Sequence, residues 1–227
     1  YFLPGEEKAN LERYAAAMRR ASGELDRLIR TISAPDKAAI FSAHKEILQD
    51  EAIHEEIAAA VGEERQTPES AVYGIYTVYA RRISRSPDAL IRERGADLID
   101  VRNRLIRCLR GLPERNLSDL AAPCIVAAHD ILPSDAAALD REKVLGLVTE
   151  VGGSTSHAAI LARGSQIPAV LGCAGIMDSV RDGEIIALDA VKGEIHTEID
   201  EETRGAYAAL RRRYEAQREK MKVWDGR

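Results

Sequence analysis

The sequence predicts a helical bundle beside a small α/β subdomain, followed by a C-terminal connector helix. Apolar residues recur with helical spacing as far as Gly111, and short apolar runs alternate with turn residues after Pro113. A charged segment from Glu201 onward again has its few apolar residues at helical spacing. We therefore divide the chain into residues 1–112, 113–200 and 201–227.

Several helices are predicted in residues 1–112. The first has apolar residues three and four positions apart, which places them on one face that needs a partner. Gly62 is suited to end a later helix. Thr67-Pro68 and Ser86-Pro87 each predict a further helix start, because a hydroxyl can cap the helix and proline has no N–H to leave unpaired. A bundle of antiparallel helices follows. The residues on the first face are Leu11, Tyr14, Met18, Ala21, Leu25, Leu28 and Ile32.

Short strands are predicted in residues 113–200. Each candidate is a short apolar run between turn residues, and helical stretches separate the runs, as expected of an α/β layer. Asp189 is expected in a turn between the last two strands. After Glu201, the narrow apolar seam suits a connector that leaves the domain, and equally a surface helix that packs lightly against it. The candidate strands are residues 124–128, 144–149, 169–172, 184–188 and 194–198.

The composition excludes several classes of protein. The 227 residues include 45% hydrophobic side chains, enough for a core, and the formal charge of −5 has no long block of one sign, which argues against a nucleic-acid surface. No apolar run is long enough for a membrane span. Three separated cysteines argue against a disulfide framework and favour a reducing, cytoplasmic location. Because the chain starts at Tyr1, we expect a segment to be missing upstream.

One glycine-rich stretch points to a specific chemistry. Residues 152–163 read GGSTSHAAILAR, with glycines and hydroxyls directly before a predicted helix. The positive end of the helix dipole would stabilise a phosphoryl group there and keep the imidazole of His157 neutral and nucleophilic. We therefore predict a covalent phosphohistidine at His157. A metal site or a serine hydrolase fits less well, because the stretch has neither a second ligand nor a G-x-S-x-G elbow. The predicted phosphate-stabilising residues are Gly153, Ser154, Thr155 and Ser156.

This stretch, together with IPAVLG at residues 167–172, resembles the phosphohistidine signature of the phosphoenolpyruvate-utilising enzymes. That family includes Enzyme I of the bacterial sugar phosphotransferase system, pyruvate phosphate dikinase and phosphoenolpyruvate synthase. Three further stretches, residues 40–51, 92–111 and 132–157, are similar to the amino-terminal half of Enzyme I and occur in the same order. The resemblance covers nearly all of the chain.

The resemblance implies a reaction for His157. In the family, this histidine takes a phosphoryl group from phosphoenolpyruvate, which is bound in a separate carboxy-terminal barrel, and passes it to the histidine-containing phosphocarrier protein. The resemblance implies that this barrel is not part of the 227 residues, so we do not expect the chain alone to use phosphoenolpyruvate. No cofactor is expected in the chain, whereas magnesium is expected in the full-length enzyme with its barrel. No membrane or nucleic-acid partner is expected.

The resemblance also implies that the helical subdomain docks the phosphocarrier. Its candidate residues mix apolar and acidic character, which suits a partner with a basic rim around an apolar centre. For Ile47 and Leu48, a place in the core of the bundle remains an equal alternative. The candidate docking residues are His44, Ile47, Leu48, Asp50, Glu51, Arg94 and Asp97.

The sequence departs from the Enzyme I pattern at one position. Where that family has a threonine that can hydrogen-bond the active histidine, this chain has Ala136. Ser134, Thr155 or a backbone carbonyl could orient the ring instead. For Arg163, we expect a helix-capping or salt-bridging role. The other histidines singled out, His54, His129 and His196, are interpreted as structural or surface residues.

Two other functions remain open. The chain could be the swivelling phosphohistidine domain of a dikinase or synthase, although the long helical region before the signature disfavours that assignment. It could also be a regulatory module that docks phosphocarrier-like proteins without transferring phosphate. Retained binding without phosphorylation of His157 would select this last hypothesis.

Overall fold

The computed structural model describes residues 1–32, 34–114, 117, 119–154 and 156–225, and the chain forms two compact units. The helical unit comprises Tyr1–Asp119 and Leu132–Leu139, and the α/β unit comprises Leu120–Ile131 and Asp140–Arg227. Residues 132–139 lie in the region that the sequence assigned to the α/β subdomain, but they pack with the helices. The chain therefore enters the α/β unit, returns to the helical unit for eight residues and enters the α/β unit again.

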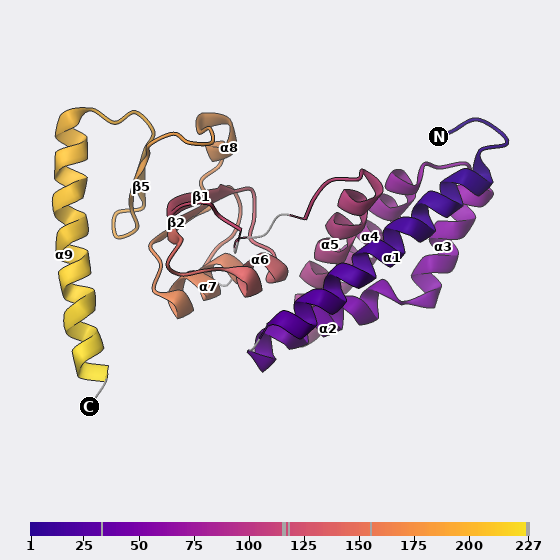
Figure 1. Cartoon of the computed structure of the whole chain (residues 1–227), viewed down its shortest axis with the longest axis horizontal. Helices are drawn as coiled ribbons and strands as arrows, with labels where there is room; N and C mark the ends of the chain where they lie inside the picture. The colour runs from indigo at the N-terminus through magenta and orange to yellow at the C-terminus, as the bar shows by residue number, and fades with distance from the viewer. Residues whose placement is uncertain (33, 115–116, 118, 155, 226–227) are drawn as a thin grey trace. The chain divides into compact units, whose positions relative to one another are not determined.

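The helical unit is a bundle in which α1 is the common neighbour. This helix contacts α2, α3, α4 and α5, and the short α6 packs against α2 and α5. Figure 1 shows α1 to α5 lying lengthwise beside one another. The helices are α1 (Glu7–Thr31), α2 (Pro35–Leu48), α3 (Glu51–Gly62), α4 (Pro68–Ile83), α5 (Ala89–Leu109) and α6 (Pro133–Ala138).

Local signals set the helix ends. The Thr67 hydroxyl accepts a hydrogen bond from the N–H of Ser70, and Pro68 takes the first helical position of α4, as predicted. The predicted start of α5 at Pro87 is wrong by two residues. The hydroxyl of Ser86 accepts from the N–H of Asp88, and the Asp88 carboxylate accepts from the N–H of Ile91, so α5 begins only at Ala89.

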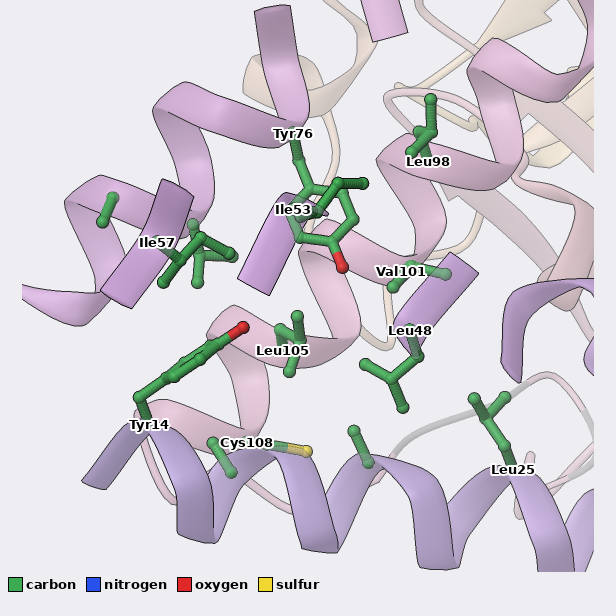
Figure 2. Packing of buried hydrophobic residues seen from close by; sticks show 14 of the residues in the cluster. Tyr14, Leu25, Leu48, Ile53, Ile57, Tyr76, Leu98, Val101, Leu105 and Cys108 are labelled. Carbon is green, nitrogen blue, oxygen red and sulfur yellow. The ribbon is translucent and has the colours of Figure 1, made fainter. Parts of the chain in front are cut away.

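The core of the helical unit combines side chains from all five long helices. Figure 2 shows Tyr14 and Leu25 of α1, Leu48 of α2, Tyr76 of α4 and Leu105 of α5 directed into one interior. Four of these five are completely buried, and Tyr14 is nearly so. The predicted apolar face of α1 therefore packs inward, because only burial against the other helices removes it from water.

A cluster of charges ties α1 to α5. The carboxylate of Glu24 accepts hydrogen bonds from Arg104 at 3.0 Å and from Arg107, and Arg104 also reaches Glu114 at 3.0 Å. Only 11% of the Glu24 side chain and 9% of the Arg104 side chain are exposed. Burial alone would raise the pKa of Glu24, but the hydrogen bonds and charges of Arg107 and Arg104 outweigh it, so that pKa lies below its ordinary value.

The α/β unit is built on a parallel sheet with the strand order β1-β2-β3. Val148 pairs with Ala127 on one side and with Val170 on the other, which makes β2 the central strand. Helix α7 packs against β2 and β3, and the short α8 packs against β1. The elements are β1 (Cys124–Ala128), β2 (Val144–Thr149), α7 (His157–Ser165), β3 (Ala169–Leu171) and α8 (Ile176–Ser179).

A hairpin and a long helix complete the α/β unit. β4 (Ala187–Asp189) and β5 (Glu194–His196) pair antiparallel, and the Asp189 carboxylate accepts from the N–H groups of Val191 and Lys192, which confirms the predicted turn. The final helix is α9 (Glu201–Asp225), and its Tyr214 hydroxyl donates to the carbonyl of Gln166 at 3.0 Å. In the part of the chain that the structure describes, no helix is both long and apolar enough to cross a membrane.

Candidate functional site

The candidate site lies at the carboxyl edge of the parallel sheet. Because β1, β2 and β3 are parallel, their last residues lie along one edge. We call residues 150–154 and 156, which follow β2 at this edge, the signature loop. The hydroxyl of Thr149 donates to the carbonyl of Val151 at 2.6 Å, and the N–H of Cys173 donates to the carbonyl of Thr149 at 2.8 Å. The segment after β3 therefore helps to hold the start of the loop.

Two glycines are required by the geometry of this edge. Gly152 has a φ of +110°, and a Cβ there would lie 3.1 Å from the Ser156 hydroxyl oxygen. Gly172 has a φ of +75°, and a Cβ there would lie 3.2 Å from the carbonyl oxygen of Gly152. A side chain at either position would meet both backbone strain and crowding. Gly153 differs, because a Cβ at this position would meet no atom within 4 Å.

His157 is the first residue of α7. The preceding Ser156 caps the helix, since its hydroxyl accepts a hydrogen bond from the N–H of Ala159 at 3.2 Å. Ala158, Ala159 and Ala162 are buried, whereas the His157 side chain is half-buried. The imidazole is therefore anchored by a well-packed helix and lies at the end where N–H groups lack intrahelical acceptors and the dipole is positive.

The predicted phosphate-stabilising residues occupy different positions in the signature loop. Gly153 and Ser154 are exposed, and Ser156 is half-buried with its oxygen engaged in the helix cap. Thr155 lies outside the described residues. Arg163 also holds the signature loop. Its guanidinium nitrogen Nη2 donates a hydrogen bond to the carbonyl of Ser154 at 2.8 Å. This contact is neither the salt bridge nor the helix cap expected for Arg163.

A second pair of polar residues lies at the same edge, and sequence reasoning did not identify it. His129 follows β1, and Glu150 follows β2; the ring nitrogen Nδ1 of His129 lies 2.7 Å from the Glu150 carboxylate. The other carboxylate oxygen accepts from the N–H of Met177 at 3.3 Å. The hydrogen bond with His129 and those with the backbone hold the pKa of Glu150 below its ordinary value. The position of both residues directly after predicted strands was the signal that could have revealed them.

The structure divides the candidate docking residues into two sets. The side chains of His44 and Leu48 are fully buried, and the His44 ring nitrogen Nε2 lies 3.1 Å from the carboxylate of Asp97. Neither side chain is available to a partner, because each fills the interior between α2 and its neighbours. Asp97 and Ile47 are half-buried. The exposed candidates are Asp50, Glu51 and Arg94.

The segment around Ala136 is bound to α5. The hydroxyl of Ser134 donates to one carboxylate oxygen of Asp100, and its N–H donates to the other, both at 2.8 Å. Only 4% of Asp100 is exposed, so the two hydrogen bonds compensate for the burial of its charge. The Ser134 hydroxyl hydrogen is thus engaged within the helical unit.

The described residues offer no metal centre. Within residues 1–32, 34–114, 117, 119–154 and 156–225, no three His, Cys, Asp or Glu side chains converge to hold an ion. The donor set of these described residues therefore does not fit a magnesium site.

Sequence comparison assigns both units to one family. Residues 3–94 match the model of the PEP-utilising enzyme N-terminal region, and residues 120–193 match that of the PEP-utilising enzyme mobile domain. The chain is 36% identical over 187 residues to the phosphoenolpyruvate-protein phosphotransferase of Mycoplasma capricolum, covering 82% of this chain and 33% of that protein. It is 32% identical over 216 residues to that of Priestia megaterium, covering 94% and 38%. The chain thus spans about a third of these relatives' length.

Solved structures agree with the sequence relatives. The NMR solution structure of an Enzyme I protein (nEIt) superimposes with a TM-score of 0.76 and 32% identity, over 94% of this chain and 88% of that one. The N-terminal domain of a nitrogen-type Enzyme 1 gives a TM-score of 0.56 and 25% identity, over 91% and 85%. These matches confirm the predicted fold class, a helical bundle followed by a small α/β region with a parallel sheet. The chain therefore belongs to the PEP-utilising enzyme family and is homologous to the amino-terminal portion of its Enzyme I members, the phosphoenolpyruvate-protein phosphotransferases.

Proposed function

We propose that His157 carries a phosphoryl group and exchanges it with the histidine-containing phosphocarrier protein. The observation that supports this most is the position of the half-buried His157 as the first residue of α7. It directly follows the Ser156 helix cap and a loop that requires glycine at position 152. That end of a helix favours an anion next to the imidazole. The match of residues 120–193 to the mobile domain of PEP-utilising enzymes supports the same role.

The exchange needs only a nucleophile and an environment that stabilises charge. The lone pair on a ring nitrogen of His157 forms a bond to phosphorus as the P–N bond of the phosphocarrier histidine breaks, and that bond's electron pair returns to the donor nitrogen. No water, oxidant or cosubstrate is consumed. The chain's contribution is positioning and electrostatic stabilisation of the transferring group.

In the full-length protein, we propose that phosphoenolpyruvate supplies the phosphoryl group from a carboxy-terminal domain outside this chain. The magnesium expected for that step would be held there. All three cysteines of this chain are free thiols, which supports a cytoplasmic location.

The test is the mass of the intact chain under neutral or alkaline conditions, which preserve phosphohistidine. We expect the chain to gain one phosphoryl group after mixing with phosphorylated phosphocarrier. It should also gain one from phosphoramidate, a small donor that requires no docking surface. Binding of the phosphocarrier without any mass gain from either donor would contradict the proposal and select the non-catalytic docking module.

We further propose that the phosphocarrier docks on the exposed start of α3. We choose Glu51 for the substitution that tests this docking surface. The neighbouring Asp50 also caps α3 by accepting a hydrogen bond from the N–H of Ile53 at 3.1 Å, so replacing Asp50 would also disturb the helix. Glu51→Lys should raise the phosphocarrier concentration needed for half-maximal transfer about fivefold, as expected for reversal of an exposed charge. Transfer from phosphoramidate should be unchanged.

The matched control is Glu63→Lys, which reverses an exposed charge at the other end of the same helix. If both variants weaken transfer from the phosphocarrier equally, only net charge matters and the docking surface lies elsewhere.

A further inference from the structure

We infer that Arg163 binds the phosphoryl group on His157 while it holds the signature loop, an inference that rests on the proposed function. Arg163 lies six residues after His157 on α7. Helical side chains point back toward the N-terminus, and this one reaches the carbonyl of Ser154, three residues before His157, at 2.8 Å. The backbone of Arg163 is therefore in the second turn of α7, whereas its guanidinium contacts the signature loop that precedes the helix.

The charge of Arg163 is unfavourable at this place unless an anion is present. The amino-terminal end of a helix is positive, so a cation there is repelled by the dipole rather than stabilised by it. Arg163 is exposed and, among the described residues, forms no ion pair with a carboxylate. A phosphoryl group on His157, with a charge of about −1.5 to −2, would offset both positive charges.

The hydrogen-bonding geometry of arginine allows both roles at once. A guanidinium has five N–H donors in a planar fork, and the Ser154 carbonyl occupies one donor of Nη2. The bond to Ser154 fixes the fork, and the remaining donors can bind phosphoryl oxygens in the charge-assisted manner that arginine favours. Arg163 forms and breaks no covalent bond in this role. It stabilises the charge on the transferring group as the P–N bond changes partners.

A matched arginine lies at the other end of the same helix. Arg141 donates from Nη2 to the carbonyl of Gly164, in the last turn of α7. Arg141→Gln and Arg163→Gln therefore each remove one positive charge and one guanidinium-to-carbonyl hydrogen bond, at opposite ends of α7. Only the second change removes a group from the end that carries His157.

The experiment is single-turnover transfer from phosphorylated phosphocarrier, measured over a range of carrier concentrations. Arg163→Gln should lower the maximal rate about 100-fold, as expected for loss of one preorganised donor at a developing charge. The half-saturating concentration should change less than about twofold. Arg163→Lys, which keeps the charge but not the fork, should lie in between, and Arg141→Gln should match the unmodified chain.

A second readout separates phosphate binding from a purely structural role. In the phosphorylated chain, ³¹P NMR should show that Arg163→Gln raises the pKa for the second ionisation of the phosphoryl group, because a nearby cation favours the dianion. Arg141→Gln should leave that pKa unchanged. Equal maximal rates for the two glutamine variants, or a slower rate without a change in this pKa, would overturn the inference. Absence of transfer to the unmodified chain would instead overturn the proposed function.

Discussion

Replacing His157 with alanine is expected to abolish phosphoryl uptake from both phosphorylated phosphocarrier and phosphoramidate. The substitution removes the nucleophile, and no remaining group of the signature loop can form the P–N bond. The fold should persist, because His157 is only half-buried and the Ser156 cap and the buried alanines that anchor α7 are untouched. Intact mass under alkaline conditions measures uptake, and the thermal midpoint measured by circular dichroism checks the fold.

The matched control for this prediction is His196→Ala. His196 lies on β5 of the same unit, and its side chain is 43% exposed, so its removal tests for histidine phosphorylation outside the proposed site. We expect this variant to take up one phosphoryl group as the unmodified chain does. If the His157 variant still gains mass, phosphorylation occurs elsewhere and the proposed site is wrong.

Replacing Glu24 with glutamine is expected to give the largest loss of stability of the substitutions considered. The change leaves the largely buried Arg107 without its carboxylate partner and leaves the nearly buried Arg104 with Glu114 alone. Removing one partner from a largely buried ion-pair cluster lowers the free energy of unfolding by about 3 kcal/mol. Denaturant titration at pH 7 measures this. As a control on the same helix, Glu12→Gln breaks an exposed pair with Lys8 and should change stability by less than about 1 kcal/mol.

The stability difference between the unmodified chain and Glu24→Gln is expected to depend on pH. The folded-state pKa of Glu24 is depressed, so its stabilisation is present above the unfolded-state value and is lost as the pH falls through the folded-state value. The difference in unfolding free energy between the unmodified chain and Glu24→Gln should therefore be constant near neutrality. It should shrink below about pH 4, near the ordinary glutamate pKa. A difference that stays constant down to pH 2 would contradict this account of the cluster.

Local patterns predicted the elements of this chain well, because each depends on residues close in sequence. The helical period from Leu11 to Ile32 predicted α1, and the short apolar runs predicted β1 and β2 at their observed bounds. The position of His157 in the first turn of a helix followed from the glycines and hydroxyls before it. These features need no knowledge of the partner surfaces.

Contacts between distant residues were not predictable in the same way. His44 and Leu48 lie on α2 with helical spacing, but only the packed bundle reveals that both point inward rather than toward a partner. Likewise, His129 and Glu150 are separated by 21 positions, and the parallel pairing of β1 with β2 brings them together. The contact of Arg163 with Ser154 depends on a rotamer that a helical period does not specify.

The return of residues 132–139 to the helical unit has a consequence for synthesis on the ribosome. Asp100 precedes β1 in the sequence, whereas Ser134, which donates both hydrogen bonds to its buried carboxylate, follows β1. The two hydrogen bonds can therefore form only after β1 has been synthesised. During translation, the helical unit therefore lacks these two hydrogen bonds and the packing of α6 against α2 and α5 while the first strand of its neighbour emerges. A nascent chain arrested at residue 119 should accordingly resist proteolysis less well than one arrested after residue 139 has left the exit tunnel.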